Sequence, residues 1–226
     1  AKKVLESQDQ PTDNIEDQLL DQLIETEKIK IIATNKNVKV TESDIQSSYQ
    51  AILRKFPNNN EAEFVKTLLD NYGMDINTFK TQVVRQSVLQ DNLKLWFNQQ
   101  ESLNNTQYTK ARDLVKQLDT GSNFDEVATK YSQDNASKPF AGDSGFTKFS
   151  EMLPEFQSAV KDLSIGDTKI VASRYGIHVL RVKAIEGDSA KQAERNYNLL
   201  QIFLEPADFS AWLKTQTQDI KSVKLL

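Results

Sequence analysis

The chain contains no cysteine and a single histidine among its 226 residues. Disulfides and thiolate metal sites are therefore excluded. Histidine-based zinc sites and catalytic triads are disfavoured, because only one histidine is available to form them. No apolar run approaches the roughly 20 residues that a membrane-spanning helix needs. The net charge is -4, and Lys and Arg form no cluster of the kind that binds nucleic acid. We therefore expect no metal, no cofactor, no nucleic acid and no membrane span.

Glycine is also scarce, and its distribution divides the chain. Residues 1–72 contain none, whereas five of the seven glycines lie between residues 142 and 187. Glycine supplies the positive-φ positions that tight turns between strands need. The sequence therefore predicts a helical first part, a mixed α/β middle and a helical tail, which together make an α+β protein.

Local signals predict several helices in the first part. Thr41 and Asp44 form a capping box, a further helix runs from about residue 61 to Gly73, and Asp75 caps a long one. Short helices are marginal alone, so they must pack on one another. The plain interpretation of their apolar stripes is core packing. The alternative is that part of this surface stays open as a groove for extended, apolar client chains.

The middle and the tail carry different apolar patterns. The tail holds two apolar groups, which we interpret as two amphipathic helices that must bury against a distant helical layer. The helical first part provides such a layer. The tail residues concerned are Tyr197, Leu200, Phe203, Leu204, Phe209, Trp212 and Leu213. In the middle, we expect helices at 108–118, 124–131 and 154–163, and strands at 144–149, 168–173 and 177–185.

Five segments of the middle occur in a characteristic order: NFDEVATKYSQD, GDSGF, EMLPEFQSAV, LSIGD and YGIHVLRV. Together they resemble the parvulin family of peptidyl-prolyl isomerases, and the flanking parts resemble the SurA family of chaperones. The resemblance implies a parvulin-like domain with a small antiparallel sheet at residues 102–188. It also implies an all-helical chaperone module that residues 1–101 and 189–226 form together, with the parvulin-like domain inserted between them.

The same resemblance implies a function and a compartment. It predicts a periplasmic chaperone that binds unfolded or extended polypeptides, in particular segments of outer-membrane proteins. The alternative is a catalytically active peptidyl-prolyl cis-trans isomerase, and a plainer one is a module that only binds peptide or spaces its neighbours. The chain opens on Ala1, so either a signal peptide for export across the inner membrane has been removed or the start has been trimmed.

The resemblance also implies site residues. Rotation about an X-Pro bond faces a barrier of about 18–20 kcal/mol, and an apolar pocket that favours the twisted amide needs no cofactor. Met152 and Phe156 would bind the proline ring, with Ser144 in the pocket wall where the family usually has Leu. Asp134 and His178 are the catalytic candidates. Each has a structural alternative: core for Met152 and Phe156, a loop or cap for Asp134, and strand hydrogen bonding for His178.

One strand of the expected domain is missing from its usual place. Active parvulins begin with a strand that carries another histidine, directly before the helix expected at residue 108, but this stretch reads NQQESLNNTQYTKARD. Because His178 is the only histidine, paired histidines cannot form. Either the strand is lost or replaced, which predicts an open central edge and a degenerate domain, or residues between about Glu101 and Asn104 are missing from the sequence.

Overall fold

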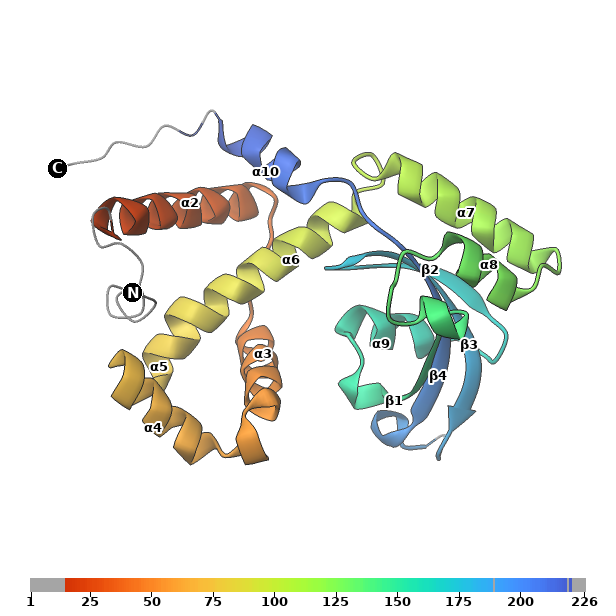
Figure 1. The fold of residues 1–226 in the computed structure, drawn as a ribbon, viewed down its shortest axis with the longest axis horizontal. Coiled ribbons are helices and arrows are strands. Elements are labelled where there is room, and N and C mark those ends of the chain that lie inside the picture. The colour runs from red at the N-terminus through yellow and green to blue at the C-terminus, as the bar shows by residue number, and fades with distance from the viewer. Residues whose placement is uncertain (1–14, 189, 219, 221–226) are drawn as a thin grey trace. The chain divides into compact units, whose positions relative to one another are not determined.

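The computed structural model describes residues 15–188, 190–218 and 220. Within this part of the chain, two compact units separate, and the fold class is α+β as predicted (Figure 1). The helical unit comprises the described residues up to Leu93 together with those from Ser210 onward. The sheet unit comprises Lys94–Phe209.

The helical unit begins and ends its helices at local capping signals. At the predicted capping box, the Asp44 N–H donates to Thr41 Oγ1 at 3.1 Å, and the Thr41 N–H donates to Asp44 Oδ2 at 2.9 Å. Gly73 ends the next helix in the left-handed conformation, at a φ of 61°. The elements of the helical unit are α2 (Ile15–Asn35), α3 (Glu42–Lys55), α4 (Glu61–Tyr72), α5 (Ile76–Thr78), a π-helical turn (Phe79–Val84), and most of α6 (Arg85–Gln99) and α10 (Phe209–Thr217). The last residues of α6, from Lys94, and the first residue of α10, Phe209, belong to the sheet unit.

Aromatic packing holds α3, α4 and the π-helical turn together. The Phe64 ring lies edge-on to the rings of Phe56 and Phe79, with centroids 5.3 and 5.6 Å apart. Tyr49 of α3 is fully buried in the same cluster. The residues of α10 from Ser210 onward lie beside α2, and both helices line one shallow hollow. The apolar stripes of α3 and α4 are therefore mainly core.

The sheet unit holds four antiparallel strands in the order β1-β4-β3-β2. Its central strand β4 comes from the part of the tail that we expected to be helical, and that expectation is wrong. The expected open central edge is wrong too, because β4 fills it. The strand is buried on both faces, as a central strand must be. The bounds are β1 (Asp143–Lys148), β2 (Thr168–Ser173), β3 (Gly176–Glu186) and β4 (Asn196–Leu204).

Helices cover both faces of this sheet (Figure 1). We call the first the packing face: α7 (Asn105–Asp119) and α8 (Phe124–Tyr131) lie on it. The second, which we call the site face, is covered by α9 (Pro154–Val160). Side chains alternate between faces along a strand, so neighbours in sequence enter different cores. The buried packing-face residues of the strands are Ile177, Val179, Leu200, Ile202 and Leu204, and those of the site face include Val171, Leu180, Val182, Tyr197 and Leu199.

The stretch before α7 forms helix ends instead of a strand. Asn104, which is fully buried, donates from Nδ2 to the Phe97 carbonyl at 2.8 Å and accepts the Ala207 N–H at 2.9 Å. Asn98 donates from Nδ2 to the Ser173 carbonyl at 2.8 Å. These two amides satisfy backbone groups at the end of β2 and shortly after β4, so this stretch supports the sheet from outside it.

Candidate functional site

His178 lies in the middle of the site face. On β3 it pairs with Phe203 of β4 on one side and Val171 of β2 on the other. Only 5% of the residue is exposed, and its Nε2 lies 2.8 Å from the buried Ser173 hydroxyl. The Phe156 ring stands edge-on to the imidazole at 4.9 Å, and the Phe203 ring lies at 5.1 Å. His178 is therefore both hydrogen-bonded within its sheet and enclosed by aromatic rings.

Asp134 lies in the loop after α8, and this loop is attached to β4. The Gln133 N–H donates to the Phe203 carbonyl at 2.8 Å. The carboxylate accepts the Ala136 N–H at 3.1 Å on Oδ1, and it accepts both the Ser137 N–H at 3.2 Å and the Ser137 hydroxyl on Oδ2. The predicted turn role of Asp134 is thus present, and the same carboxylate also faces the sheet.

Gln201 links this carboxylate to the sheet. Its Nε2 donates to Asp134 Oδ2 at 2.7 Å from the site face of β4. Burial lowers the pKa of His178 to about 4, against opposing effects of the Gln201 amide and the Asp134 carboxylate. Burial alone would raise the pKa of Asp134, but hydrogen bonds from Ser137, Ala136 and Gln201 outweigh it and lower that pKa. Near neutral pH the site therefore holds a neutral imidazole and one carboxylate.

The predicted apolar residues lie beside this polar pair. Met152 is buried in the core cluster of the site face, and the half-buried Phe156 packs against the same cluster. Because Phe156 also contacts His178, Met152, Phe156 and His178 form one wall of the site. Ser144 is exposed on the edge strand β1, where its hydroxyl donates to the Leu199 carbonyl at 2.8 Å.

Sequence reasoning missed Gln201, Phe203, Ser137 and Ser173. The first two were missed because the tail was interpreted as helical. The signal that could have found them was the missing strand itself, together with the β-forming run NYNLLQIFL at residues 196–204. Ser173 and Ser137 carry no sequence signal, because only the fold brings their hydroxyls to His178 and Asp134.

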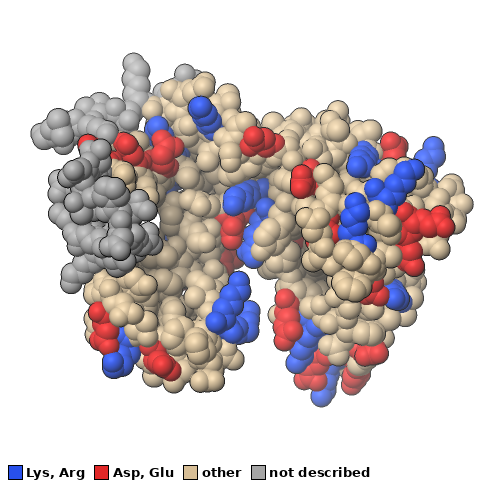
Figure 2. Space-filling model, in the orientation of Figure 1, with Lys and Arg blue, Asp and Glu red and all other residues tan. Residues whose placement is uncertain are grey.

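Two further observations describe the surface and the metal-binding potential. On the face shown in Figure 2, Lys and Arg are interspersed with Asp and Glu on both units. Within residues 15–188, 190–218 and 220, no three or more His, Asp or Glu side chains gather as metal ligands. In the same ranges, no helix has the length and apolar character that crossing a membrane would need.

The family comparison covers the predicted residues of this site. Residues 77–186 match the model of the PPIC-type PPIASE domain. Over these residues the chain therefore carries a PPIC-type, parvulin-like domain. The match ends at residue 186, so β4 lies beyond it.

Named relatives include foldases and chaperones. Foldase protein PrsA 2 of Bacillus cereus is 26% identical over 187 residues, which are 75% of this chain and 64% of that protein. Chaperone SurA of Chromohalobacter salexigens is 32% identical over 116 residues, 50% of this chain and 26% of that protein. A solved peptidylprolyl isomerase (PrsA) from Bacillus anthracis aligns with a TM-score of 0.30 and 21% identity, over 88% of this chain and 85% of that one. The chain thus spans between 26 and 64% of the length of these two curated relatives.

Proposed function

We propose that this protein is a foldase: a chaperone that holds unfolded or extended polypeptides and carries a parvulin-type domain for their X-Pro segments. The family match and the relatives named foldase and chaperone support this proposal. We further propose an organisation that changes the expected one at its C-terminal part: helical chaperone segments at 1–101 and after β4, in place of 1–101 and 189–226. The parvulin-like domain begins at residue 102 and extends past residue 188 to include β4.

The observation that carries the proposal is the wall formed by Met152, Phe156 and His178, beside which Gln201 holds the Asp134 carboxylate. In the proposed complex, Met152 and Phe156 bind the proline ring, and Ser144 contacts the peptide at the sheet edge. Asp134 and His178 act at the amide that rotates. An apolar wall removes water from the amide, so the site can bind the twisted form better than the planar one. Neither step requires a cofactor.

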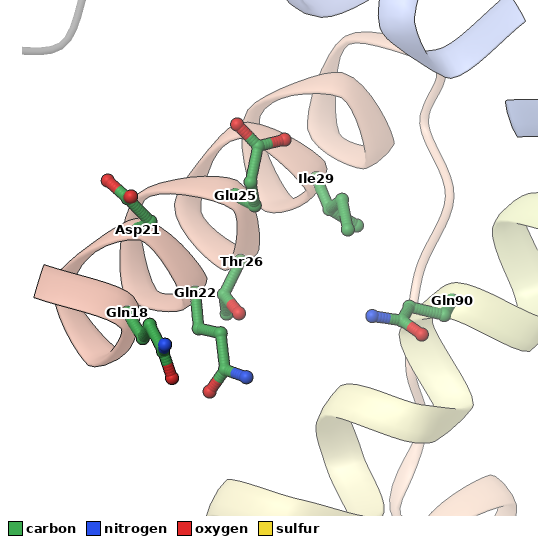
Figure 3. A pocket seen from close by; sticks show the side chains of 7 residues that line it. All are labelled: Gln18, Asp21, Gln22, Glu25, Thr26, Ile29 and Gln90. Carbon is green, nitrogen blue, oxygen red and sulfur yellow. The ribbon is translucent and has the colours of Figure 1, made fainter. Parts of the chain in front are cut away.

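The helical unit supplies surface on which a client can be held. Several large apolar side chains are exposed there, and α2 and α6 line an open hollow of about 650 Å³ (Figure 3). Gln18, Gln22 and Thr26 of α2 and Gln90 of α6 are among the residues that line it. Amide side chains both donate and accept hydrogen bonds, so they suit the backbone of an extended peptide. The exposed apolar residues are Leu23, Ile31, Leu69, Tyr72 and Val83.

A holdase test addresses the chaperone function directly. An unfolded outer-membrane β-barrel protein is diluted from urea with and without stoichiometric amounts of the full chain, and light scattering is followed. We expect suppression of aggregation at a one-to-one ratio. An unchanged scattering curve, with the helical unit folded by circular dichroism, would refute the chaperone proposal.

The proposed compartment is the periplasm, and the proposed clients are outer-membrane proteins. The lack of cysteine is compatible with an oxidising compartment, and the relatives named SurA and PrsA support a role on exported proteins. Fractionation of cells that express the natural gene tests the compartment. Recovery with cytoplasmic markers would refute it.

A second candidate function is peptidyl-prolyl isomerisation, which the complete four-stranded sheet and the Phe156–His178 contact favour. A protease-coupled assay on an X-Pro peptide tests it. We expect Phe156→Ala to lower kcat/KM at least about tenfold, because it removes the ring that holds proline. The matched control is Phe140→Ala, at a phenylalanine of the same unit that is 69% exposed. A wild-type rate equal to the uncatalysed rate would end this candidate and leave the chaperone proposal standing.

A further inference from the structure

Gln201 occupies a special place on the central strand. It pairs with Leu180, while Phe203 pairs with His178, so its side chain is a diagonal neighbour of His178 on the site face. Besides the bond to Asp134, its Nε2 lies 3.3 Å from Ser137 Oγ. One amide thus reaches the loop that carries the carboxylate and the strand region that carries the imidazole.

We propose that Gln201 is a positioning residue of the proposed isomerase site: its amide holds the Asp134 carboxylate toward His178 and sets the polarity around the imidazole. The inference rests on the proposed parvulin-type site and adds a residue that lies beyond the family match. It also assigns a role to β4 besides completing the sheet.

An amide is the side chain that this position requires. Its nitrogen donates to the carboxylate, and its oxygen remains as an acceptor for the ring on β3. A carboxylate at the same place would repel Asp134, and an aliphatic side chain would leave the carboxylate without its bond to the sheet. A neutral donor also keeps the site at a single negative charge, which belongs to Asp134.

The backbone around Gln201 holds the loop independently of the side chain. The Gln201 N–H donates to the Gly142 carbonyl at 2.8 Å. A Cβ on residue 142 would lie 2.5 Å from the Gln201 carbonyl oxygen, so only glycine allows this close approach. Gly142 also has a φ of 83°, which glycine adopts readily. Because these main-chain contacts persist when the side chain changes, substitutions at Gln201 test the amide rather than the attachment of the loop.

The single histidine makes the test direct. NMR of the imidazole reports on His178 without any assignment, since the chain has no other histidine. We compare Gln201→Leu, Gln201→Glu and the control Gln192→Leu, in the full chain. Gln192 is a half-buried glutamine that also bonds to β4, through Tyr197 at 2.7 Å, and Tyr197 pairs with Ile185 at the far end of the β3–β4 ladder.

We expect Gln201→Glu and Gln201→Leu to shift the pKa of His178 in opposite directions. Gln201→Glu places a second carboxylate near the ring and should raise the pKa of His178 by about one unit. Gln201→Leu should lower it and reduce kcat/KM on an X-Pro peptide at least about tenfold, because the carboxylate loses its position. Gln201→Glu should also add an inflection to the pH profile of kcat/KM, which a purely structural residue would not do. Gln192→Leu should change neither quantity.

The outcomes separate this inference from the proposed function. If the wild-type chain shows no isomerase activity, the His178 titrations still decide the role of Gln201. If Gln201→Leu and Gln201→Glu both fold and the pKa of His178 matches wild type in each, the proposed positioning role of Gln201 is wrong. If Gln201→Leu does not fold, the Gln201→Glu titration decides alone. If neither variant folds while Gln192→Leu does, Gln201 is a structural residue of β4 and the inference is wrong.

Discussion

The two faces of the sheet differ in kind although the same strands make both. On the packing face, the residues of β3 and β4 that form a core cluster with α7 and α8 are aliphatic. On the site face, an equally buried position holds His178, and Gln201 beside it reaches out to a carboxylate. Stability and chemistry are thus separated by the alternation of side chains along each strand.

Strand β4 shows the separation within two residues. Ile202 is fully buried on the packing face, while its neighbour Gln201 is half-buried on the site face. A substitution at Ile202 should therefore change the free energy of unfolding, whereas a substitution at Gln201 should change the properties of the site. Three predictions test this division, in order of decreasing effect.

The largest effect is expected from Ile202→Ala. Removing a buried aliphatic side chain from a core costs about 2–5 kcal/mol, because the transfer free energy is lost and a cavity remains. We expect a loss of that size in the free energy of unfolding of the sheet unit, measured by urea titration of tryptophan fluorescence. The titration of His178 in the folded variant should stay at the wild-type pKa.

The matched control is Ile165→Ala, at an isoleucine of the same unit that is 62% exposed. Its loss should remain below about 0.5 kcal/mol. If Ile202→Ala shifted the pKa of His178 by as much as the Gln201 variants do, the two faces would not be independent.

The second prediction concerns the site face and acid. The pKa of His178 falls from its ordinary 6.5 to about 4 on folding, chiefly through burial. Between these values the unfolded chain binds the additional proton, so stability falls as pH drops from about 6.5 to 4 and is constant above that window. The full effect is about 3 kcal/mol, at about 1.36 kcal/mol for each unit.

Urea unfolding at pH 8 and pH 4.5 measures this loss. His178→Gln removes the titrating group, so we expect a much smaller difference between the two pH values in that variant. Asp134 acts in a lower window: its lowered pKa contributes stability that is lost only as pH falls below about 4. An equal acid loss in wild type and His178→Gln would show that the histidine is not the cause.

Elements whose limits are set by nearby residues could be predicted from the sequence. In the helical unit, the start of α3 at Thr41 and the end of α4 at Gly73 were predicted correctly, because a capping box and a terminating glycine depend only on residues within one or two turns. The three predicted strands of the middle were found because turn residues delimit them. Asp134, Phe156 and His178 were predicted as site residues by resemblance; the structure places Phe156 against His178 and links Asp134 to the same sheet face through Gln201.

Strand β4 could not be read in the same way. Its run NYNLLQIFL is joined to its neighbour β3 by residues 187–195 rather than by a tight two-residue turn, and its other neighbour, β1, is distant in the sequence. A strand that is apolar on both faces has no alternation, so its pattern is ambiguous between helix and strand. Gln201 therefore lay within a segment that we expected to be helical. Pairing with β3 and with the distant β1 determines both the strand and the position of Gln201.

The smallest effect is expected at Ser144, and it asks whether the site extends from the site face onto the edge strand β1. The Ser144 hydroxyl makes one hydrogen bond, to the Leu199 carbonyl, from an exposed position. Ser144→Ala should therefore cost only about 0.5 kcal/mol in the free energy of unfolding. The control is Ser150→Ala, at an exposed serine just beyond the same strand. In the proposed complex Ser144 contacts the peptide, so the Kd for an X-Pro peptide should rise about twofold in Ser144→Ala and stay constant in the control. An unchanged Kd would confine the site to Met152, Phe156 and the polar pair, whereas a tenfold rise would make β1 a principal part of it.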